Sequence, residues 1–411
     1  MKRPFVIPSS AIASHLFLQL VNILGQLIAV PLFIKNYSKS EYVLWILLNA
    51  LTSFVLVADS AILQAFSIPL TRELVEQGTL NGYLLKRMVR ILFGIEFLSV
   101  IILSIFFCFL HIDQNSSITS EKYRIFVLLI LGNLLVVLQH YFLLHFQLQN
   151  IYTRGLRIFG SSKMVEMMSL LLLVTSSTNL TTIALSSIIV RGTSAIVMRR
   201  VVSQSAVSIS ENKIDLKGLR NNTLGSICLS GTTIFANQGV LIVIGHWSAA
   251  NAILLFTITR MMCSPIRIIG DSIAIGSFPM RLRDTLMKVE PAKKFGSIFY
   301  LYGYFILGFF CIVIFLGPYV FHFLSDGKVA YSAVFLTLVA ISISSDEIVA
   351  MKFQTSIIEN NAFRIGLQYL TVTISELALL TFIKQFHNIQ VAVALNILGD
   401  IMVFTLLARK K

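Results

Sequence analysis

Residues 10–34 read SAIASHLFLQLVNILGQLIAVPLFI, and this stretch contains no lysine, arginine, aspartate or glutamate. A helix needs about 20 mostly apolar residues to cross the hydrocarbon core of a bilayer, so the stretch predicts a membrane-spanning helix. Reading from one polar interruption to the next gives further stretches of the same kind. The twelve predicted spans cover residues 10–34, 42–68, 91–110, 125–146, 164–177, 182–198, 223–244, 251–275, 298–317, 333–350, 365–383 and 389–408.

The composition agrees with a membrane protein. Hydrophobic residues make up 56% of the 411 residues and charged residues 13%, whereas soluble domains have about 45–50% and about 25%. A soluble fold of this composition would leave large apolar patches exposed. The expected fold class is therefore an all-α, polytopic membrane protein, in which Met1-Lys2-Arg3 precedes the first span rather than a cleaved signal peptide.

The charge distribution predicts an orientation. Lysine and arginine number 33 against 19 acidic residues, a net charge of +14. With both termini in the cytoplasm, 24 basic residues fall in cytoplasmic segments and six on the opposite side, and such a bias sets topology. The basic charge therefore indicates topology and no nucleic-acid partner.

The cysteines lie in apolar stretches without metal-ligand spacing, so we expect no disulfide framework, metal site or cofactor. They are Cys108, Cys228, Cys263 and Cys311.

A polar linker and a weak repeat divide the chain into two halves. Residues 201–222 separate an N-terminal lobe of six spans, residues 1–200, from a C-terminal lobe of six spans, residues 223–411. A shift of 210 residues places Tyr37-Ser38 on Trp247-Ser248, and Ser67-Ile68-Pro69 on Ser277-Phe278-Pro279. Both copies cross the membrane in the same direction, which predicts a parallel pseudo-repeat about an axis along the membrane normal. This architecture is typical of transporters whose substrate path lies between the lobes.

Three arginines lie inside predicted spans, where a charge is expensive and normally faces a wet cavity or a partner. Arg191 and Arg260 each lie about 15 Å into a span, and we expect both to reach a central cavity and bind a phosphate through their planar donors. The alternative is that each neutralises an internal acid such as Glu376 or Asp400. Arg267 lies on the same helical face as Arg260 and either binds substrate or pairs with an acid four residues later, Asp271.

Acidic residues inside the spans are candidates for ion coupling. Glu376 and Asp400 are deep in spans eleven and twelve, and Asp59 lies late in span two, toward the cytoplasm. They either couple transport to an H⁺ or Na⁺ gradient or serve as counter-ions to the arginines. Glu166, by contrast, is placed at the cytoplasmic end of span five.

Polar side chains also mark one face of span one. The polar residues are spaced so that they share one helical face, and they either form hydrogen bonds between helices or line a hydrophilic path. Two polar residues in span seven, the corresponding helix of the second lobe, favour the path. We therefore predict that both sets bind substrate. These residues are His15, Gln19, Asn22, Gln26, Asn237 and Gln238. His140 and His145 are expected to pack or hydrogen-bond locally, not to act as ligands.

Two segments resemble a known family. Pro31-Leu32-Phe33-Ile34, followed by Tyr37 to Tyr42, Trp45 and Asp59-Ser60-Ala61, resembles the opening of bacterial O-antigen and polysaccharide flippases, which belong to the multidrug/oligosaccharidyl-lipid/polysaccharide exporter superfamily. The run from Phe256 to Met261, with Arg260, is similar to the corresponding element of their second lobe. In those proteins a glycine often follows the acid of span two, where this chain has Ser60.

The resemblance implies a V-shaped pair of lobes with a cationic cavity in the bacterial inner membrane. It implies translocation of a polyprenyl-diphosphate-linked oligosaccharide, with a polysaccharide polymerase and a chain-length regulator as further partners. A cation-coupled multidrug exporter of the same superfamily is the alternative, although the arginines argue against cationic drugs. An enzyme is not expected, because the outside loops are short and no nucleophile lies beside a base; a membrane glycan polymerase or ligase is the least favoured reading.

Overall fold

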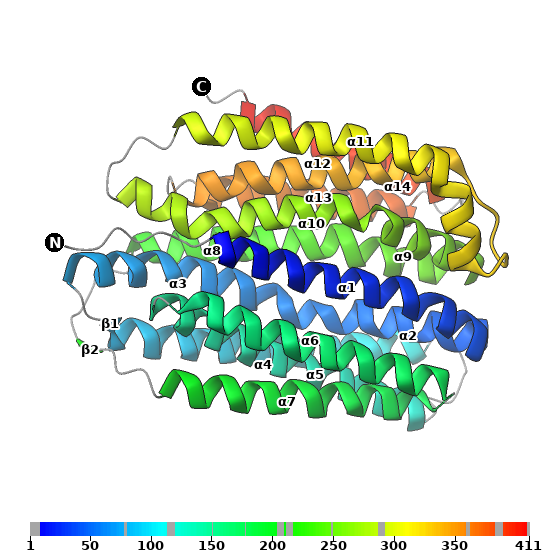
Figure 1. Ribbon diagram of the computed structural model, residues 1–411, viewed down its shortest axis with the longest axis horizontal. Helices are drawn as coiled ribbons and strands as arrows, with labels where there is room; N and C mark the ends of the chain where they lie inside the picture. Colours follow the sequence, from blue (N-terminus) through cyan, green and yellow to red (C-terminus); the bar gives the residue numbers. More distant parts are fainter. Residues whose placement is uncertain are drawn as a thin grey trace.

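The computed structural model describes residues 9–77, 80–112, 120–149, 151–176, 178–203, 209–210, 217–247, 250–286, 292–358, 362–382 and 389–408. Almost all of these residues are helical (Figure 1). The first half contains α1 (Ser9–Asn36), α2 (Lys39–Thr52), η1 (Ser53–Val55), α3 (Leu56–Gln77), α4 (Gly82–Ile112), α5 (Ser120–Leu148), α6 (Tyr152–Thr175) and α7 (Leu180–Ser203). The second half contains α8 (Lys217–Ile234), η2 (Phe235–Gly239), α9 (Val240–Trp247), α10 (Ala250–Leu286), α11 (Ala292–Ser325), α12 (Ala333–Ile358), α13 (Ala362–Phe382) and α14 (Ile389–Ala408).

Each of the twelve predicted spans falls on one helical path. Ten are single helices, span two is α2, η1 and α3 in series, and span seven is α8, η2 and α9 in series. Within the described residues, six helices are individually long and apolar enough to cross a membrane, and a bent pair in α11 makes a seventh. In Figure 1, α1 begins and α14 ends toward the same end of the bundle, as an even number of spans requires.

The repeat of 210 residues extends over the whole chain. Adding 210 to the bounds of α1 gives 219–246, against 217–247 for the path from α8 to α9. The same shift takes the path from α2 to α3 to 249–287 and α4 to 292–322, close to α10 and α11. It takes α5 to 330–358, α6 to 362–385 and α7 to 390–413, close to α12, α13 and α14. The two halves are therefore built alike, with equivalent helices running in the same direction.

Helix packing repeats in the same way. In the first half α1 packs on α6, α3 on α4 and α5, and α7 on α5 and α6. The equivalent pairs pack in the second half: α8 on α13, α10 on α11 and α12, and α14 on α12 and α13. Between the halves, α1 packs on α10 and α3 on α8. This reciprocal exchange of first and second helices is what a pseudo-twofold axis along the membrane normal produces.

Two broken helices meet at the interface between the lobes. The three residues of η1 form a 3₁₀ turn and the five residues of η2 a π-helical turn, a distortion that often marks functional positions. Phe54 of η1 and Phe235 of η2 contact edge to face, with ring centroids 5.1 Å apart. The amide of Asn133 in α5 donates to the carbonyl of Thr52 at 2.9 Å, which satisfies a backbone group at the first break.

Two further differences from the sequence-based picture have simple causes. Span five begins at Tyr152 of α6, not at 164, because Lys163 lies inside the helix and is paired with an acid. In α11 the segments Tyr302–Val313 and Phe315–Ser325 meet at 67°. Pro318 lies in the second segment and lacks the N–H that would bond the carbonyl four residues earlier, in the break, so it explains the bend.

Polar contacts at the loop ends fix the remaining geometry. The linker predicted at 201–222 is shorter as a connection, since α7 continues to Ser203 and α8 begins at Lys217. Within it, β2 (Ile209–Ser210) pairs in parallel with β1 (Leu80–Asn81), which links the linker to the chain before α4. At the opposite end, Ser38 and Glu41 form a capping box at the start of α2. The hydrogen bonds from Ser38 lower the pKa of the Glu41 carboxyl.

Candidate functional site

Arg191 belongs to an ion-pair network inside the first lobe. Its Nη2 lies 2.7 Å from Oε1 of Glu166, and its Nε donates to the same oxygen at 2.9 Å. Lys163 donates to the other oxygen of Glu166 at 2.9 Å, and Nη1 of Arg191 donates to Asn133 at 3.2 Å. The ion-paired side chains are 12–19% exposed. Arg191 is therefore neutralised by an internal acid, but this acid is Glu166 and not the predicted Glu376 or Asp400.

The prediction for Glu166 was wrong because its helix begins earlier than expected. With α6 starting at Tyr152, Glu166 lies in the middle of the helix rather than at a cytoplasmic end. A glycine in α5 makes room for the network, since a Cβ on Gly132 would lie 3.0 Å from Nη1 of Arg191.

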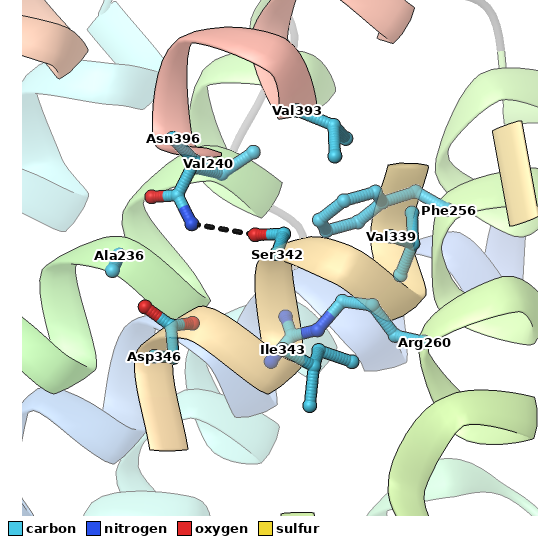
Figure 2. A pocket seen from close by; sticks show the side chains of 10 residues that line it. All are labelled: Ala236, Val240, Phe256, Arg260, Val339, Ser342, Ile343, Asp346, Val393 and Asn396. Carbon is cyan, nitrogen blue, oxygen red and sulfur yellow. Dashed lines mark hydrogen bonds between the residues drawn. The ribbon is translucent and has the colours of Figure 1, made fainter. Parts of the chain in front are cut away.

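Arg260 lines a pocket inside the second lobe. Its guanidinium lies over the ring of Phe256, 5.4 Å from the centroid, and points toward Asp346 across the pocket in Figure 2. The amide of Asn396 donates to the hydroxyl of Ser342 at 2.7 Å. The pocket has about 340 Å³ of empty space, a volume that includes its open side. Its walls come from α10, α12, α14, α9 and the π-helical turn before α9. The lining residues are Ala236, Val240, Phe256, Arg260, Val339, Ser342, Ile343, Asp346, Val393 and Asn396.

The two deep arginines thus occupy different surroundings. Arg191 is not among the residues that line the pocket of Arg260, and all the lining residues come from the second half of the chain. The expectation that both arginines share one cavity is not met in this conformation, because Arg191 lies in a network of α5, α6 and α7.

Arg267 also has an acidic neighbour. Its Nε lies 3.8 Å from Oε1 of Glu347, a residue of α12. The side chain of the sequence-predicted partner, Asp271, lies outside the described residues. Gly270 leaves space for the acid, since a Cβ there would lie 2.5 Å from Oε2 of Glu347. Among the described side chains, the acidic neighbour of Arg267 therefore comes from a different helix, α12.

Glu376 lies beside the pocket of Arg260, in an adjoining pocket that shares Ala236, Val240 and Asn396 with it. Its carboxylate lies against Gly399 of α14, where a Cβ would clash with Oε1. Within the described part of the chain, Oε1 has no hydrogen-bond partner. Asp346 repels it electrostatically. Asp400 follows Gly399, but its side chain lies outside the described residues.

Glu166 and Glu376 occupy equivalent positions of the two lobes. The shift of 210 residues places one on the other, in α6 and α13. It also places Lys163 on Thr373 and Arg191 on Ile401. The repeat therefore preserves the acid and removes both of its counter-ions in the second lobe.

Asp59 is more deeply buried than its position in the sequence suggested. It is 1% exposed, and its Oδ2 lies 2.7 Å from Nδ1 of His140 in α5. Glu96 of α4 is also 1% exposed and interacts electrostatically with Asp59. The histidine was expected to pack or hydrogen-bond locally, but its partner Asp59 lies 81 residues away in the chain, on α3. Glu96 was missed. An acid inside the apolar third span was the signal that would have found it.

The polar stripe of α1 is only partly described. Gln19 and Asn22 are half-buried and Gln26 is exposed, while the side chain of His15 lies outside the described residues, as does that of Asn237. Gln238 of η2 is half-buried at the break between α8 and α9. Since α1 packs on both α6 and α10, the stripe belongs to a helix that reaches both lobes.

Comparisons with known proteins identify the fold. No model of a known protein family matches the chain, and no curated protein matches its sequence. The crystal structure of a mutant of the Vibrio cholerae MATE transporter VcmN superposes with a TM-score of 0.64 at 13% sequence identity, over 97% of this chain and 95% of that one. The chain is thus a multi-pass, all-α membrane protein with the fold of a MATE transporter, twelve transmembrane helices in two lobes.

Proposed function

We propose that the chain is a flippase for a polyprenyl-diphosphate-linked oligosaccharide, the unit of an O-antigen or a related surface polysaccharide. It would carry this lipid from the cytoplasmic to the periplasmic leaflet of the bacterial inner membrane by alternating access, with both termini in the cytoplasm. Arg260, a cation in a pocket within the membrane, carries the proposal. A guanidinium pairs with phosphate through two parallel hydrogen bonds and does not lose its proton.

The carboxylate of Asp346 competes with the substrate for Arg260. Asp346 attracts the guanidinium of Arg260, so a diphosphate must displace this carboxylate to bind. A diphosphate brings more negative charge and more acceptor oxygens than one carboxylate, which favours the exchange. Phe256 supports the guanidinium from one face and leaves its donor edges available for the exchange.

The other predicted residues take secondary roles in this proposal. Arg191 and Arg267 would contact the substrate after release from Glu166 and Glu347 as the lobes move. The amides of α1 and Gln238 would contact glycan hydroxyls, while the lipid tail stays in the bilayer between the lobes. Glu376, Asp59 and Asp400 would couple transport to an H⁺ or Na⁺ gradient, and no cofactor is required. A polymerase and a chain-length regulator would use the product.

The test is a transfer assay in liposomes with a short fluorescent glycan on polyprenyl diphosphate. Wild-type protein should move the lipid between leaflets, and Arg260→Ala should lose most of this activity. Arg364→Ala is the matched control, because Arg364 is an exposed arginine of α13. Raising the salt concentration should weaken binding, since charge pairing is screened. Full transfer by a well-folded Arg260→Ala protein would refute the proposal.

A cation-coupled multidrug exporter is the second candidate. The observation that favours it is the pair of acids in adjoining pockets, Asp346 and Glu376, which attract a cationic ligand. Here Asp346→Asn would abolish transport and Arg260→Ala would not. A fluorescent cationic drug in the same liposomes distinguishes the two functions, because the flippase leaves it in place.

A further inference from the structure

Glu376 occupies a pocket of its own, beside the pocket of Arg260. This second pocket has about 190 Å³ of empty space, a volume that includes its open side. Of the described residues that line it, only Glu376 carries a charge. Ala236 and Asn396 belong to the walls of both pockets. In Figure 2 these two residues and Asp346 lie on one side of the first pocket, and the guanidinium of Arg260 enters from the other. The acidic pocket therefore lies across from Arg260, on the side of Asp346.

The first lobe shows which group fits beside this acid. There Lys163 of α6 donates to Glu166, three residues later, at 2.9 Å. The shift of 210 residues replaces Lys163 by Thr373 of α13, and Thr373 lines the pocket of Glu376. A lysine carries its ammonium on a four-carbon stem, whereas a threonine side chain ends at its γ atoms. The pocket of Glu376 is therefore bordered by the position from which, in the first lobe, a lysine reaches the equivalent acid.

The carboxylate of Glu376 is able to accept a group from outside the chain. Its Oε1 has no hydrogen-bond partner among the residues that the structure describes. Gly399 of α14 leaves room for this oxygen, because a Cβ there would clash with it. An ionised carboxylate accepts several hydrogen bonds, and an ammonium donates three. A ligand with a primary amine can thus supply the contact that Lys163 makes in the first lobe.

The charges of the two pockets do not balance once a diphosphate is bound. Among the described lining residues, Arg260 is the cation, and Asp346 and Glu376 are the acids. Asp346 interacts electrostatically with both of the others, and the neighbouring Arg267 lies beside Glu347. A diphosphate that displaces Asp346 from Arg260 leaves two acids facing a bound anion, and like charges in one site are costly. A positive group on the substrate removes this cost.

We infer that the pocket of Glu376 binds a protonated primary amine, and that the substrate carries this amine on the sugar attached to its diphosphate. The diphosphate pairs with Arg260, while the ammonium donates to Glu376 and Asp346. The amide of Asn396, in the wall between the pockets, is placed to contact the hydroxyls of the same sugar. This inference rests on the flippase function proposed above and adds the class of glycan, a 2-amino sugar with a free amine. The amine and a coupling ion would occupy Glu376 in turn.

The same chemistry also occurs in a phospholipid. A 2-amino sugar 1-phosphate and the phosphoethanolamine headgroup both place an amine two carbons from a phosphate oxygen. The sugar fits the pockets better, because the amide of Asn396 and the hydroxyl of Ser342 lie between the charged groups and pair with ring hydroxyls. Ethanolamine has no hydroxyl that would use them.

The direct test compares the binding of two ligands to the full chain in detergent, measured by thermal stabilisation. One is a short polyprenyl diphosphate with a 2-amino sugar, and the other carries the N-acetyl form of the same sugar, which has no charge. Wild type should bind the amine about tenfold more tightly, as expected for a hydrogen bond to a charged group. Glu376→Gln should bind both ligands equally. Glu121→Gln is the control, since Glu121 is exposed at the start of α5, and should keep the preference.

A second variant tests the comparison with Lys163. Thr373→Lys should place an ammonium of the chain itself beside Glu376, so it should lose the preference for the amine and still bind the N-acetyl ligand. Thr373→Val has nearly the shape of threonine and is the matched control, which should keep the preference. Equal affinity of wild type for the two ligands overturns the inference. A preference that persists in Glu376→Gln or in Thr373→Lys does so as well.

Two further measurements separate the inference from its neighbours. A short-chain phosphoethanolamine lipid should bind more weakly than the amino-sugar ligand; equal binding that depends on Glu376 would assign the pockets to a phospholipid headgroup and overturn the glycan. Transfer of both glycans in liposomes tests the proposed function. If wild type prefers the amine but moves neither glycan, the flippase proposal fails and the amine site stands. If it moves both and binds them equally, only the amine site fails.

Discussion

Glu166 in the first lobe and Glu376 in the second occupy equivalent positions but have opposite surroundings. Glu166 accepts from Lys163 and Arg191, and Glu376 has threonine and isoleucine at the equivalent positions, Thr373 and Ile401. Gly399, which makes room for Glu376, is replaced by Ile189 in the first lobe. A buried acid with two cations is a structural link, whereas one without them changes its charge state more readily. The repeat thus separates a structural acid from a candidate for ion coupling.

The largest effect is expected from removing the charge of the paired acid. Glu166→Gln leaves Arg191 and Lys163 as uncompensated buried cations, which should cost about 3–5 kcal/mol of stability. Glu376→Gln removes a charge that lacks a cationic partner within the described residues, so stability should stay equal or rise. Thermal unfolding of both variants in detergent checks the difference. Equal loss of stability in the two would contradict the distinction between the lobes.

A charge transplant sharpens the same comparison. Thr373→Lys with Ile401→Arg gives Glu376 the counter-ions of Glu166. The double variant should fold and lose the dependence of transport on an ion gradient that Glu376 provides. An unchanged gradient dependence would remove Glu376 from the coupling proposal.

Gly399→Ala should have the next largest effect. The added methyl group would occupy the position of Oε1 of Glu376, and such overpacking typically costs about 1–3 kcal/mol. It should displace the carboxylate and reduce ion coupling. The matched control is Ile189→Ala at the equivalent, exposed position of the first lobe, where transport should not change. Unfolding and gradient-driven transfer measure the two consequences separately.

A contact between the lobes should contribute less. Lys328, in the loop between α11 and α12, donates to the carbonyl of Ile34 near the end of α1 at 2.8 Å. The ammonium is about half exposed, so the bond is worth roughly 0.5–1 kcal/mol. Lys328→Met should change the equilibrium between lobes in contact and lobes separated at this end by less than tenfold, in favour of separation. Spin-label distances between Ser40→Cys and Ala330→Cys, with the native cysteines replaced, report the populations; an unchanged distribution would exclude this role.

An effect of similar size is expected at the capping box of α2. Ser38→Ala should cost about 0.5–1 kcal/mol, as loss of an N-cap does. Because the folded state lowers the pKa of Glu41, its contribution is present above the unfolded pKa and is lost as pH falls through the folded value. Unfolding measured from neutral to acidic pH should show this loss in wild type. The loss should be smaller in Glu41→Gln, and an identical pH profile would contradict the assignment.

The sequence predicted the helices better than their contacts. Span limits came from apolar length, and the repeat at 210 residues, seen at Ser67-Ile68-Pro69, proved to cover all six helix pairs. The start of span five was misplaced because Lys163 was taken as a boundary, although Glu166 neutralises it inside the helix. Hydropathy treats each charge alone and therefore misses such compensation.

The sequence by itself determined that the chain crosses the membrane, how many times it does so, and which segments of the first half correspond to which segments of the second. These properties follow from the length of apolar segments and the helical period, which are local. Only the tertiary structure decided that Arg191 pairs with Glu166, that His140 contacts Asp59, and that Arg260 faces Asp346. In a bilayer a buried charge normally pairs with another group or faces a wet cavity. The helices that pack together decide which partner is within reach, and distance along the chain does not.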